Sequence, residues 1–442
     1  MPRPPLPPTV RAFLWFRVFF NARFYYPVLA VFFVDLGITL DRYALLNTAW
    51  AASIVLFEVP LGAVADRVGR RPLIIFASLL MVVEMAVLGF APTGNPTLLF
   101  WIFLVNRVLS GLAEAAASGA DEALAYDTLA NAGRRNEWPQ VLGSLQRRVS
   151  IAFVASMILG AAVYDPDLVN GFLALLGIDA GLDQVATTRF PVYLTLLLSF
   201  GAVASALRMR ECETCAGPGR PEAMEGGLAE VRDTARWIRS TAFVATLILF
   251  ALALDSVVRL FLTLNSSYYR MIGIPAALFG VLGAGFSALG FLSPSLAERL
   301  VRRRTPLANY ALLFVLALIG FVGVAYATDW IALLFVGLLA ISFHLLNFFS
   351  SHYLNDATDS HRRATVLSFK SLAGNLAYGT VGWGYAMLMR SLAGGGMPSP
   401  GSELEQSLLA RTLVWIPVAL AVLAVPLLLR AARIPRMRSL DP

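Results

Sequence analysis

Charged side chains and cysteines are both scarce in this chain of 442 residues. Only 14% of the residues are charged and 58% are hydrophobic, whereas about a quarter of a typical soluble domain is charged. The mean hydropathy is +0.69. Two cysteines cannot form a disulfide framework. The composition therefore argues against an ordinary water-soluble domain and against a disulfide-stapled one, and it favours a protein that lies in a bilayer.

Lysine is almost absent, since only one of the 35 basic residues, Lys370, is a lysine. It lies within the run 365–375 of small and apolar residues, roughly 10 Å deep in a predicted membrane span. A buried ammonium group can lose its proton, whereas a guanidinium group stays charged. We therefore interpret Lys370 as a compact or titratable charge, and a lysine that snorkels to the membrane surface is the alternative.

Apolar runs long enough to cross a bilayer recur along the chain, because about 20 apolar residues span a hydrocarbon core of about 30 Å. We predict an all-α membrane protein with about twelve transmembrane helices. The first run has no small-residue cleavage site, so we interpret it as a retained helix. The predicted spans are 11–34, 43–64, 73–91, 97–120, 140–163, 190–208, 241–265, 275–297, 307–326, 329–351, 364–389 and 408–430.

The basic residues predict the orientation of these spans and explain the net charge of +7. If both termini are cytoplasmic, roughly 23 basic residues lie on the cytoplasmic side and roughly five outside, as the positive-inside rule expects. We therefore predict a multi-pass protein of the cytoplasmic (inner) membrane. Its partners are the lipid bilayer and a small-molecule substrate, and no nucleic acid is needed to explain the charge.

A polar linker divides the predicted spans into two sets of six. Residues 209–239 are rich in Pro, Gly, Glu and Arg, which predicts a cytoplasmic connector. The segment LGAVADRVGRRPL (61–73) after span two matches PSLAERLVRRRTPL (294–307) after span eight. We predict an N-terminal six-helix bundle (1–208) and a C-terminal one (240–442), related by a pseudo-two-fold axis. Transporters built this way bind substrate between the repeats.

The two cysteines lie within the linker, as Cys212-Glu-Thr-Cys215. A lone pair of this spacing supplies two metal ligands, and no histidine lies nearby in the sequence. We therefore interpret both as incidental thiols of a reducing compartment rather than as a zinc or redox site. We expect no metal and no cofactor.

Three motifs carry a resemblance to the major facilitator superfamily. The segment EVPLGAVADRVGRR (58–71) resembles the superfamily's signature between spans two and three. Arg107-Val-Leu-Ser-Gly111 resembles its Arg-x-x-x-Gly signature in span four, and SGADEALAYD (118–127) resembles the end of that span in many bacterial members. The resemblance extends over essentially the whole chain, and it implies alternating access with spans one, four, seven and ten around a central cavity.

The motif between spans two and three predicts a cytoplasmic gate. Glycine permits close helix approach and a sharp turn, and Asp127 at the end of span four can accept an arginine. Such pairs would hold the inner helix ends together in one state and release them in another. The alternative is that these arginines only set the topology. The proposed gate consists of Gly62, Asp66, Arg67, Gly69, Arg70, Arg71 and Asp127.

Charges inside predicted spans each need a partner or a water-filled cavity, because burial in the bilayer costs at least about 2.5–3.5 kcal/mol. By the resemblance, Arg23, Arg107, Arg259 and His344 lie on cavity helices, whereas Glu84 lies outside the cavity and we expect it in a structural pair. The charged residues in predicted spans are Arg17, Arg23, Glu58, Glu84, Arg107, Glu114, Arg147, Arg148, Asp255, Arg259 and Lys370.

Arg23 and Arg259 occupy similar positions in the two repeats, because each lies 14 residues before a glycine. Facing each other, they would clamp a phosphate or carboxylate, similar to organophosphate antiporters of the superfamily. We then expect both, with Lys370, to face water. The alternative is internal neutralisation, since Asp255 lies one helical turn from Arg259 and Glu114 lies two turns from Arg107.

These residues define the predicted sites. For substrate binding we predict Arg23, Arg259, Lys370, Tyr26, Arg107, Asn375 and His344. For proton coupling the candidates are Glu58, Glu114 and Asp255.

We expect a secondary active transporter for a small organic solute, anionic in the leading hypothesis, coupled to protons or working by exchange. The alternative is a proton-coupled multidrug efflux antiporter, in which a carboxylate dominates and the arginines are paired. The drug/proton antiporters carry a Gly-Pro-rich motif late in span five, where this chain has Gly160 and no proline before Pro166. We expect no enzyme activity and a monomer.

Overall fold

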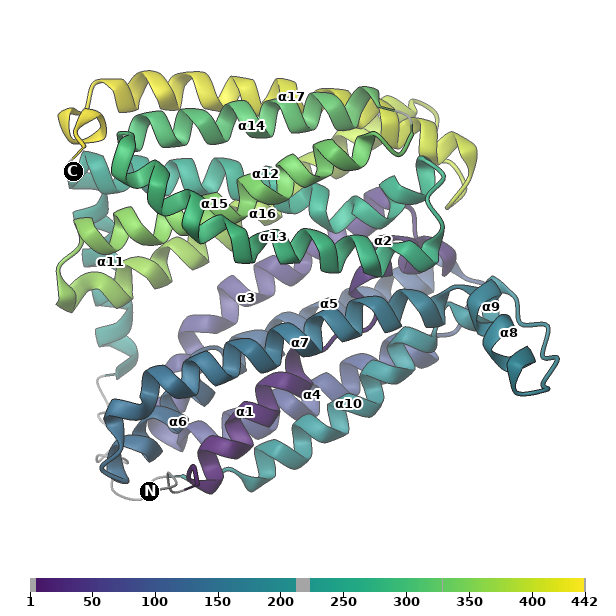
Figure 1. Ribbon diagram of the computed structural model, residues 1–442, viewed down its shortest axis with the longest axis horizontal. Helices are drawn as coiled ribbons and strands as arrows, with labels where there is room; N and C mark the ends of the chain where they lie inside the picture. The colour runs from purple at the N-terminus through teal and green to yellow at the C-terminus, as the bar shows by residue number, and fades with distance from the viewer. Residues whose placement is uncertain (1–4, 212–222, 328, 441–442) are drawn as a thin grey trace. The chain divides into compact units, whose positions relative to one another are not determined.

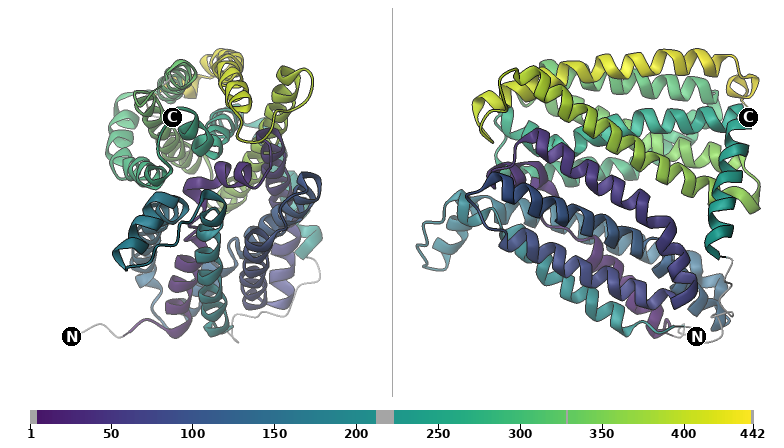
Figure 2. Two further views of the ribbon diagram at one scale, coloured as in Figure 1. Left: turned by 90° about the vertical axis from the view of Figure 1, so that its right-hand side faces the viewer. Right: turned by 180° about the vertical axis from the view of Figure 1, so that it is seen from behind.

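The computed structural model describes residues 5–211, 223–327 and 329–440, and the regular elements in these ranges are all helices (Figures 1 and 2). The predicted all-α class is thus confirmed. In chain order the elements are α1 (Pro8–Asn21), η1 (Tyr26–Val28), α2 (Leu29–Asp35), α3 (Leu40–Val68), α4 (Arg70–Phe90), α5 (Pro96–Ala117), α6 (Ala120–Asn131), η2 (Arg135–Glu137), α7 (Trp138–Tyr164), α8 (Pro166–Leu175), α9 (Gln184–Thr187), α10 (Phe190–Arg208), α11 (Ala223–Ser240), α12 (Ala242–Met271), α13 (Ala276–Arg303), α14 (Pro306–Tyr326), α15 (Ala332–Ala357), α16 (Ser360–Ala393), α17 (Glu403–Ala432) and η3 (Pro435–Arg438).

Among the described residues, ten helical stretches are long and apolar enough to cross a membrane, and α13 makes eleven if its two parts count as one span. The two parts, Ala276–Phe291 and Ser293–Arg303, meet at 41°, beside Pro294, which cannot donate the helical hydrogen bond. The predicted span 364–389 lies within α16, whose many small and polar residues make it less apolar than the others. The count of twelve is therefore not fully confirmed.

The chain divides into two compact units. Unit 1 comprises Met1–Gly37, Ala52–Gly227 and Ala276–Val281, and unit 2 comprises Ile38–Ala51, Leu228–Pro275 and Leu282–Pro442. Helices α3 and α13 therefore each contribute residues to both units. In the linker that we predicted at 209–239, residues from Ala223 onward form α11. Cys212 and Cys215 lie outside the described residues.

In unit 1, α4 packs against α5 and α10, and α1 packs against α10, α7 and α6. The first span is broken, because α1 ends at Asn21 and η1 begins only at Tyr26. Irregular backbone at membrane depth is tolerated where protein surrounds it. Here the Phe24 amide donates to Thr195 Oγ1 of α10 at 3.0 Å. The break is therefore enclosed by neighbouring helices.

Gly160 of α7 allows the broken segment to pack closely. A Cβ atom at this position would overlap the carbonyl group of Phe24, so only glycine fits without a backbone shift. On the same helix, the Met157 carbonyl lies where a Cβ of Gly280 would be. Two backbones thus approach α7 closely, which is how small residues stabilise helix pairs in lipid.

In unit 2, α12 packs against α15, α16 and α17, and α14 packs against α15 and α17. The rings of Phe250 and Tyr310 stack with centroids 4.6 Å apart, and the buried Tyr268 hydroxyl donates to the Val324 carbonyl at 3.0 Å. Asp41, at the start of α3, accepts from Arg390 Nε of α16 at 2.7 Å. Aromatic packing and satisfied polar groups thus hold this unit together.

We predict that Gly160→Ala destabilises the protein, because the new methyl group must displace the Phe24 carbonyl and the hydrogen bond beside it. The expected cost is about 1–3 kcal/mol, measured as a lower melting temperature of the detergent-purified protein. Gly143→Ala is the matched control, since it lies on the same helix and its Cβ would meet nothing within 4 Å. Equal melting temperatures for the two variants would contradict the close approach.

Candidate functional site

A buried ion pair lies beside the break in the first span. Arg23 Nη1 donates to Glu84 Oε1 of α4 at 2.9 Å, and the two side chains are only 5% and 1% exposed. Ser110 of α5 donates to the same oxygen at 3.1 Å. The structural pair expected for Glu84 is confirmed. We expected Arg23 to face water, but the break turns it toward α4, where Glu84 neutralises it.

Arg107 of α5 is buried in the same unit, at 5% exposure. Its guanidinium carbon lies 4.9 Å from the ring centroid of Phe33, and its Nε and Nη2 have no hydrogen-bond partner within the described part of the chain. We considered Glu114 as its ionic partner. Instead Glu114 is exposed and interacts electrostatically with Arg23, so Arg107 rests on an aromatic face rather than on a carboxylate.

A second ion pair joins the first and fourth spans. Arg17 Nη2 of α1 donates to Asp121 Oδ1 of α6 at 2.8 Å, and the Asp121 side chain is fully buried. Asp121 belongs to the motif at the end of span four that the sequence singled out. Sequence spacing did not predict this pair, because its partners are separated by 104 positions.

The proposed gate contains the ion pair expected at the end of span four. Arg70 of α4 pairs with Asp127 of α6, and each side chain is about one-third exposed. The expectation that Asp127 accepts an arginine is thus confirmed. The Asp66 side chain lies outside the described residues. At Gly62 the described residues show no close helix approach, because a Cβ there would meet none of their atoms within 4 Å.

Gly69 forms the sharp turn that the motif predicted, with φ at +99°. The turn exposes the first backbone amides of α4. The amides of Arg70 and Arg71 donate hydrogen bonds to the carboxylate oxygens of Glu211 at 3.1 and 2.9 Å. A carboxylate is favoured at a helix N-terminus. Sequence reasoning missed Glu211, because it lies in the linker, 140 residues from its partner.

A polar cluster in unit 2 joins α12 and α16. Arg259 pairs with Asp255 one turn away, which is the internal neutralisation considered as the alternative to the clamp. Arg259 Nη1 also donates to Asn375 Oδ1 at 3.0 Å, and its guanidinium lies 5.2 Å from the Tyr378 ring centroid. Lys370, half-buried on α16, interacts electrostatically with both Asp255 and Arg259. Two cations therefore share one carboxylate in this cluster.

The other predicted site residues lie apart from these pairs. Tyr26 is 41% exposed and packs edge-on against Tyr25. His344 Nε2 lies 3.3 Å from the Phe286 carbonyl oxygen, and its ring fills the space over Gly290. Glu58 is half-buried on α3, with no hydrogen bond or ion pair to the described residues.

The predicted residues divide between the units. Unit 1 holds Arg23, Tyr26, Glu58, Arg107 and Glu114, and unit 2 holds Asp255, Arg259, His344, Lys370 and Asn375. The clamp between Arg23 and Arg259 therefore stays a prediction. Among the described residues, no group of three or more His, Cys, Asp or Glu side chains could hold a metal ion.

Comparison with known proteins identifies the family. The sequence profile of the Major Facilitator Superfamily matches residues 12–382. This chain belongs to that superfamily. It is 27% identical to the class G tetracycline resistance protein of Vibrio anguillarum, over 68% of each chain. It is 24% identical to the class E tetracycline resistance protein of Escherichia coli, over 66% of this chain and 67% of that one.

Solved structures share the fold. A bacterial homologue of the human lysosomal transporter Spinster, inward-facing and unoccupied, superposes with a TM-score of 0.73 at 16% identity, covering 98% of each chain. The nucleoside transporter NupG superposes with a TM-score of 0.67 at 13% identity, covering 94% of this chain and 97% of that one. This chain is therefore a membrane transporter by family, and it shares the fold of these solved structures.

We predict that Glu84→Ala destabilises the protein by about 3–5 kcal/mol, because it leaves the buried Arg23 without a counter-charge. The double variant Arg23→Leu with Glu84→Leu should lose less stability than Glu84→Ala, because it leaves no unpaired charge buried. The melting temperatures of the single and double variants test this. The matching single variants are Arg23→Leu and Glu84→Leu. If the double variant loses as much stability as these two lose in sum, the two side chains are not coupled.

For the proposed gate, we predict that Asp127→Arg slows transport, because it places a like charge beside Arg70. Adding Arg70→Asp should restore part of the rate by reforming the pair in the opposite sense. The assay measures substrate uptake into inverted membrane vesicles at equal protein levels. No recovery in the swapped variant would mean that the pair has no role beyond setting topology.

Proposed function

We propose that this transporter exports an amphipathic, drug-like organic compound in exchange for protons, by alternating access in the cytoplasmic membrane. The proposal includes six-helix bundles at 1–208 and 240–442, a cytoplasmic linker, cytoplasmic termini and a monomeric state. It adopts the alternative from the sequence rather than the small-anion hypothesis. The single observation that carries it is that three of the arginines inside the spans are paired with carboxylates of the protein.

Three of these arginines already have carboxylate partners: Arg17 with Asp121, Arg23 with Glu84 and Arg259 with Asp255. A guanidinium that must bind a small anion needs free donors facing water. Arg23 is 5% exposed, and its Nη1 pairs with Glu84. Binding a substrate anion at Arg23 would therefore require this buried ion pair to break. The similarity to tetracycline resistance proteins supports the same choice of substrate class.

Proton coupling needs a carboxylate that is not already committed to an arginine. Glu58 and Glu114 meet this condition, because neither forms an ion pair with another described residue. Glu114 is exposed, and it interacts electrostatically with Arg23 and Tyr26. A proton arriving at Glu114 would therefore change the field at the buried pair beside the broken span. We propose Glu114 as the first coupling residue and Glu58 as the second.

One observation favours the small-anion hypothesis as a second candidate. In the unit 2 cluster, Arg259 and Lys370 share Asp255, which leaves one positive charge without a carboxylate. An anionic group of a substrate would complete this cluster. The two candidates make different demands on Lys370: an anion carrier needs its charge for every substrate, whereas the exporter of a neutral or cationic compound does not.

To test the proposal, the transporter is expressed in a tetracycline-sensitive bacterium, and the accumulation of tetracycline is measured in energised cells. We expect expression to lower accumulation, and a protonophore to abolish the difference. Glu114→Gln should lose most of the export, because an amide cannot carry the proton. Glu403→Gln is the matched control, since Glu403 is exposed at the first turn of α17, and it should export as the parent does.

Two results would contradict the proposal. Accumulation that is unaffected by expression across tetracyclines and other amphipathic antibiotics would exclude a drug exporter of this class. The second result is export that continues in both Glu114→Gln and Glu58→Gln but stops in Lys370→Ala. It would assign the coupling to the unit 2 cluster and favour the small-anion hypothesis.

A further inference from the structure

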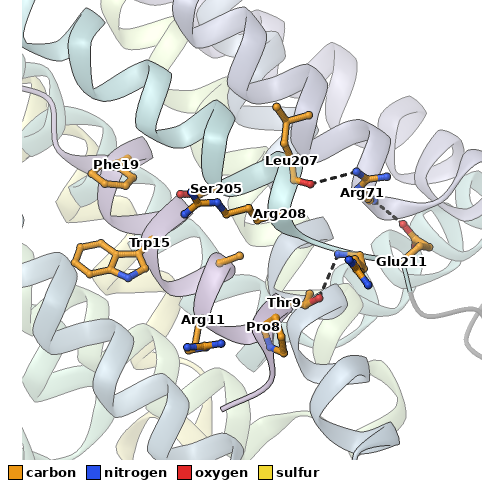
Figure 3. A pocket seen from close by; sticks show the side chains of 12 residues that line it. Pro8, Thr9, Arg11, Trp15, Phe19, Arg71, Ser205, Leu207, Arg208 and Glu211 are labelled. Carbon is orange, nitrogen blue, oxygen red and sulfur yellow. Dashed lines mark hydrogen bonds between the residues drawn. The ribbon is translucent and has the colours of Figure 1, made fainter. Parts of the chain in front are cut away.

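A groove with a strongly basic lining opens on unit 1, at the N-terminal end of α1 and the C-terminal end of α10. Its volume is about 1400 Å³. Four arginines and one glutamate line it: Arg11, Arg71, Arg208, Arg210 and Glu211. Figure 3 shows Arg11 near the first turn of α1 and Arg71 beside Glu211, with the apolar Trp15 and Phe19 further along α1. We call this feature the basic groove.

The positive charge of the basic groove is not neutralised by its own glutamate. The Glu211 carboxylate accepts from the backbone amides of Arg70 and Arg71. Arg71 Nη2 donates to the Leu207 carbonyl at 3.2 Å (Figure 3), while its buried Nε has no hydrogen-bond partner among the described residues. Guanidinium donors that line a groove and lack protein acceptors favour an anionic ligand.

The remaining three arginines, Arg11, Arg208 and Arg210, are exposed. Their side chains form no ion pair within the part of the chain that the structure describes. They come from two helix ends and from the segment after α10, so several forked donors converge on one groove. Forked guanidinium groups bind phosphate through paired hydrogen bonds.

The location of the basic groove places it at the membrane surface. The first candidate span begins at Pro8, and the span that contains α10 ends at Arg208. Trp15, two turns into α1, is 49% exposed, and the guanidinium of Arg148 lies 5.5 Å from its ring centroid. Tryptophan is enriched where the hydrocarbon core meets the headgroup region. The groove thus has a cationic end and an apolar end.

We propose that the basic groove binds the headgroup of an anionic phospholipid, with an acyl chain lying against Trp15 and Phe19. Basic pockets between membrane helices suit such headgroups. A free phosphate would use the arginines but not the apolar end, which is why the lipid is the favoured occupant. This binding site is separate from the substrate and coupling residues of the proposed function.

The test titrates the detergent-purified protein with dioleoyl phosphatidylglycerol or dioleoyl phosphatidylcholine and counts bound lipid by native mass spectrometry. The protein should bind phosphatidylglycerol more tightly. The triple variant Arg11→Gln, Arg208→Gln, Arg210→Gln should weaken this binding about tenfold or more. It spares Arg71, which belongs to the proposed gate. Trp15→Ala should weaken it as well, because the acyl chain loses its contact.

The control is the triple variant Arg302→Gln, Arg303→Gln, Arg304→Gln, which removes the same charge from exposed positions at the end of α13. It should bind phosphatidylglycerol as the parent does. Equal weakening in both triple variants would overturn the proposal in favour of non-specific attraction. Displacement of the lipid by an equal concentration of inorganic phosphate, with no effect of Trp15→Ala, would overturn it in favour of a free-anion site.

Discussion

The ion pair between Arg23 and Glu84 is the interaction on which unit 1 depends. The first span cannot continue as one helix through Ala22–Tyr25, so backbone groups and an arginine are left at membrane depth. Glu84 neutralises the arginine, and Thr195 satisfies a freed amide. Without these partners the break would be too costly in a bilayer. The break, in turn, requires glycine at position 160 of the adjoining helix.

Pairing of the arginines also constrains function. When buried cations are balanced within the chain, the charges left for transport are those without a fixed partner. In unit 1 these are Arg107, which lies against the ring of Phe33, and the carboxylates of Glu58 and Glu114. Two such carboxylates fit the proton-driven cycle that we propose. In unit 2 the surplus is a cation, Lys370 beside Arg259 and Asp255. The ammonium group of a lysine is more compact than a guanidinium group, which distinguishes this position from the arginines elsewhere in the chain.

Local features were predictable from the sequence. Of the long-range contacts, only the arginine at Asp127 was expected, on the family motif. Apolar runs placed the helices, the motif at Gly69 predicted a sharp turn, and the spacing of Asp255 and Arg259 predicted their pair. By contrast, Arg23 and Glu84 are separated by 61 positions, and no periodic pattern connects them. Glu211 lay in a segment that composition marked only as linker. Arg107 had a carboxylate two turns away in sequence, yet it stacks on Phe33.

We propose that the substrate is a drug-like compound rather than a small anion, because three arginines of the spans are paired with carboxylates of the protein itself. The most direct measurement is the melting temperature of the purified protein with tetracycline or with small organic anions such as oxalate. A ligand that binds the native state stabilises it by RT ln(1 + [L]/Kd), so the melting temperature rises with ligand concentration. Our account predicts a dose-dependent rise with tetracycline and none with oxalate. A rise with oxalate alone, lost in Arg23→Ala, would contradict it.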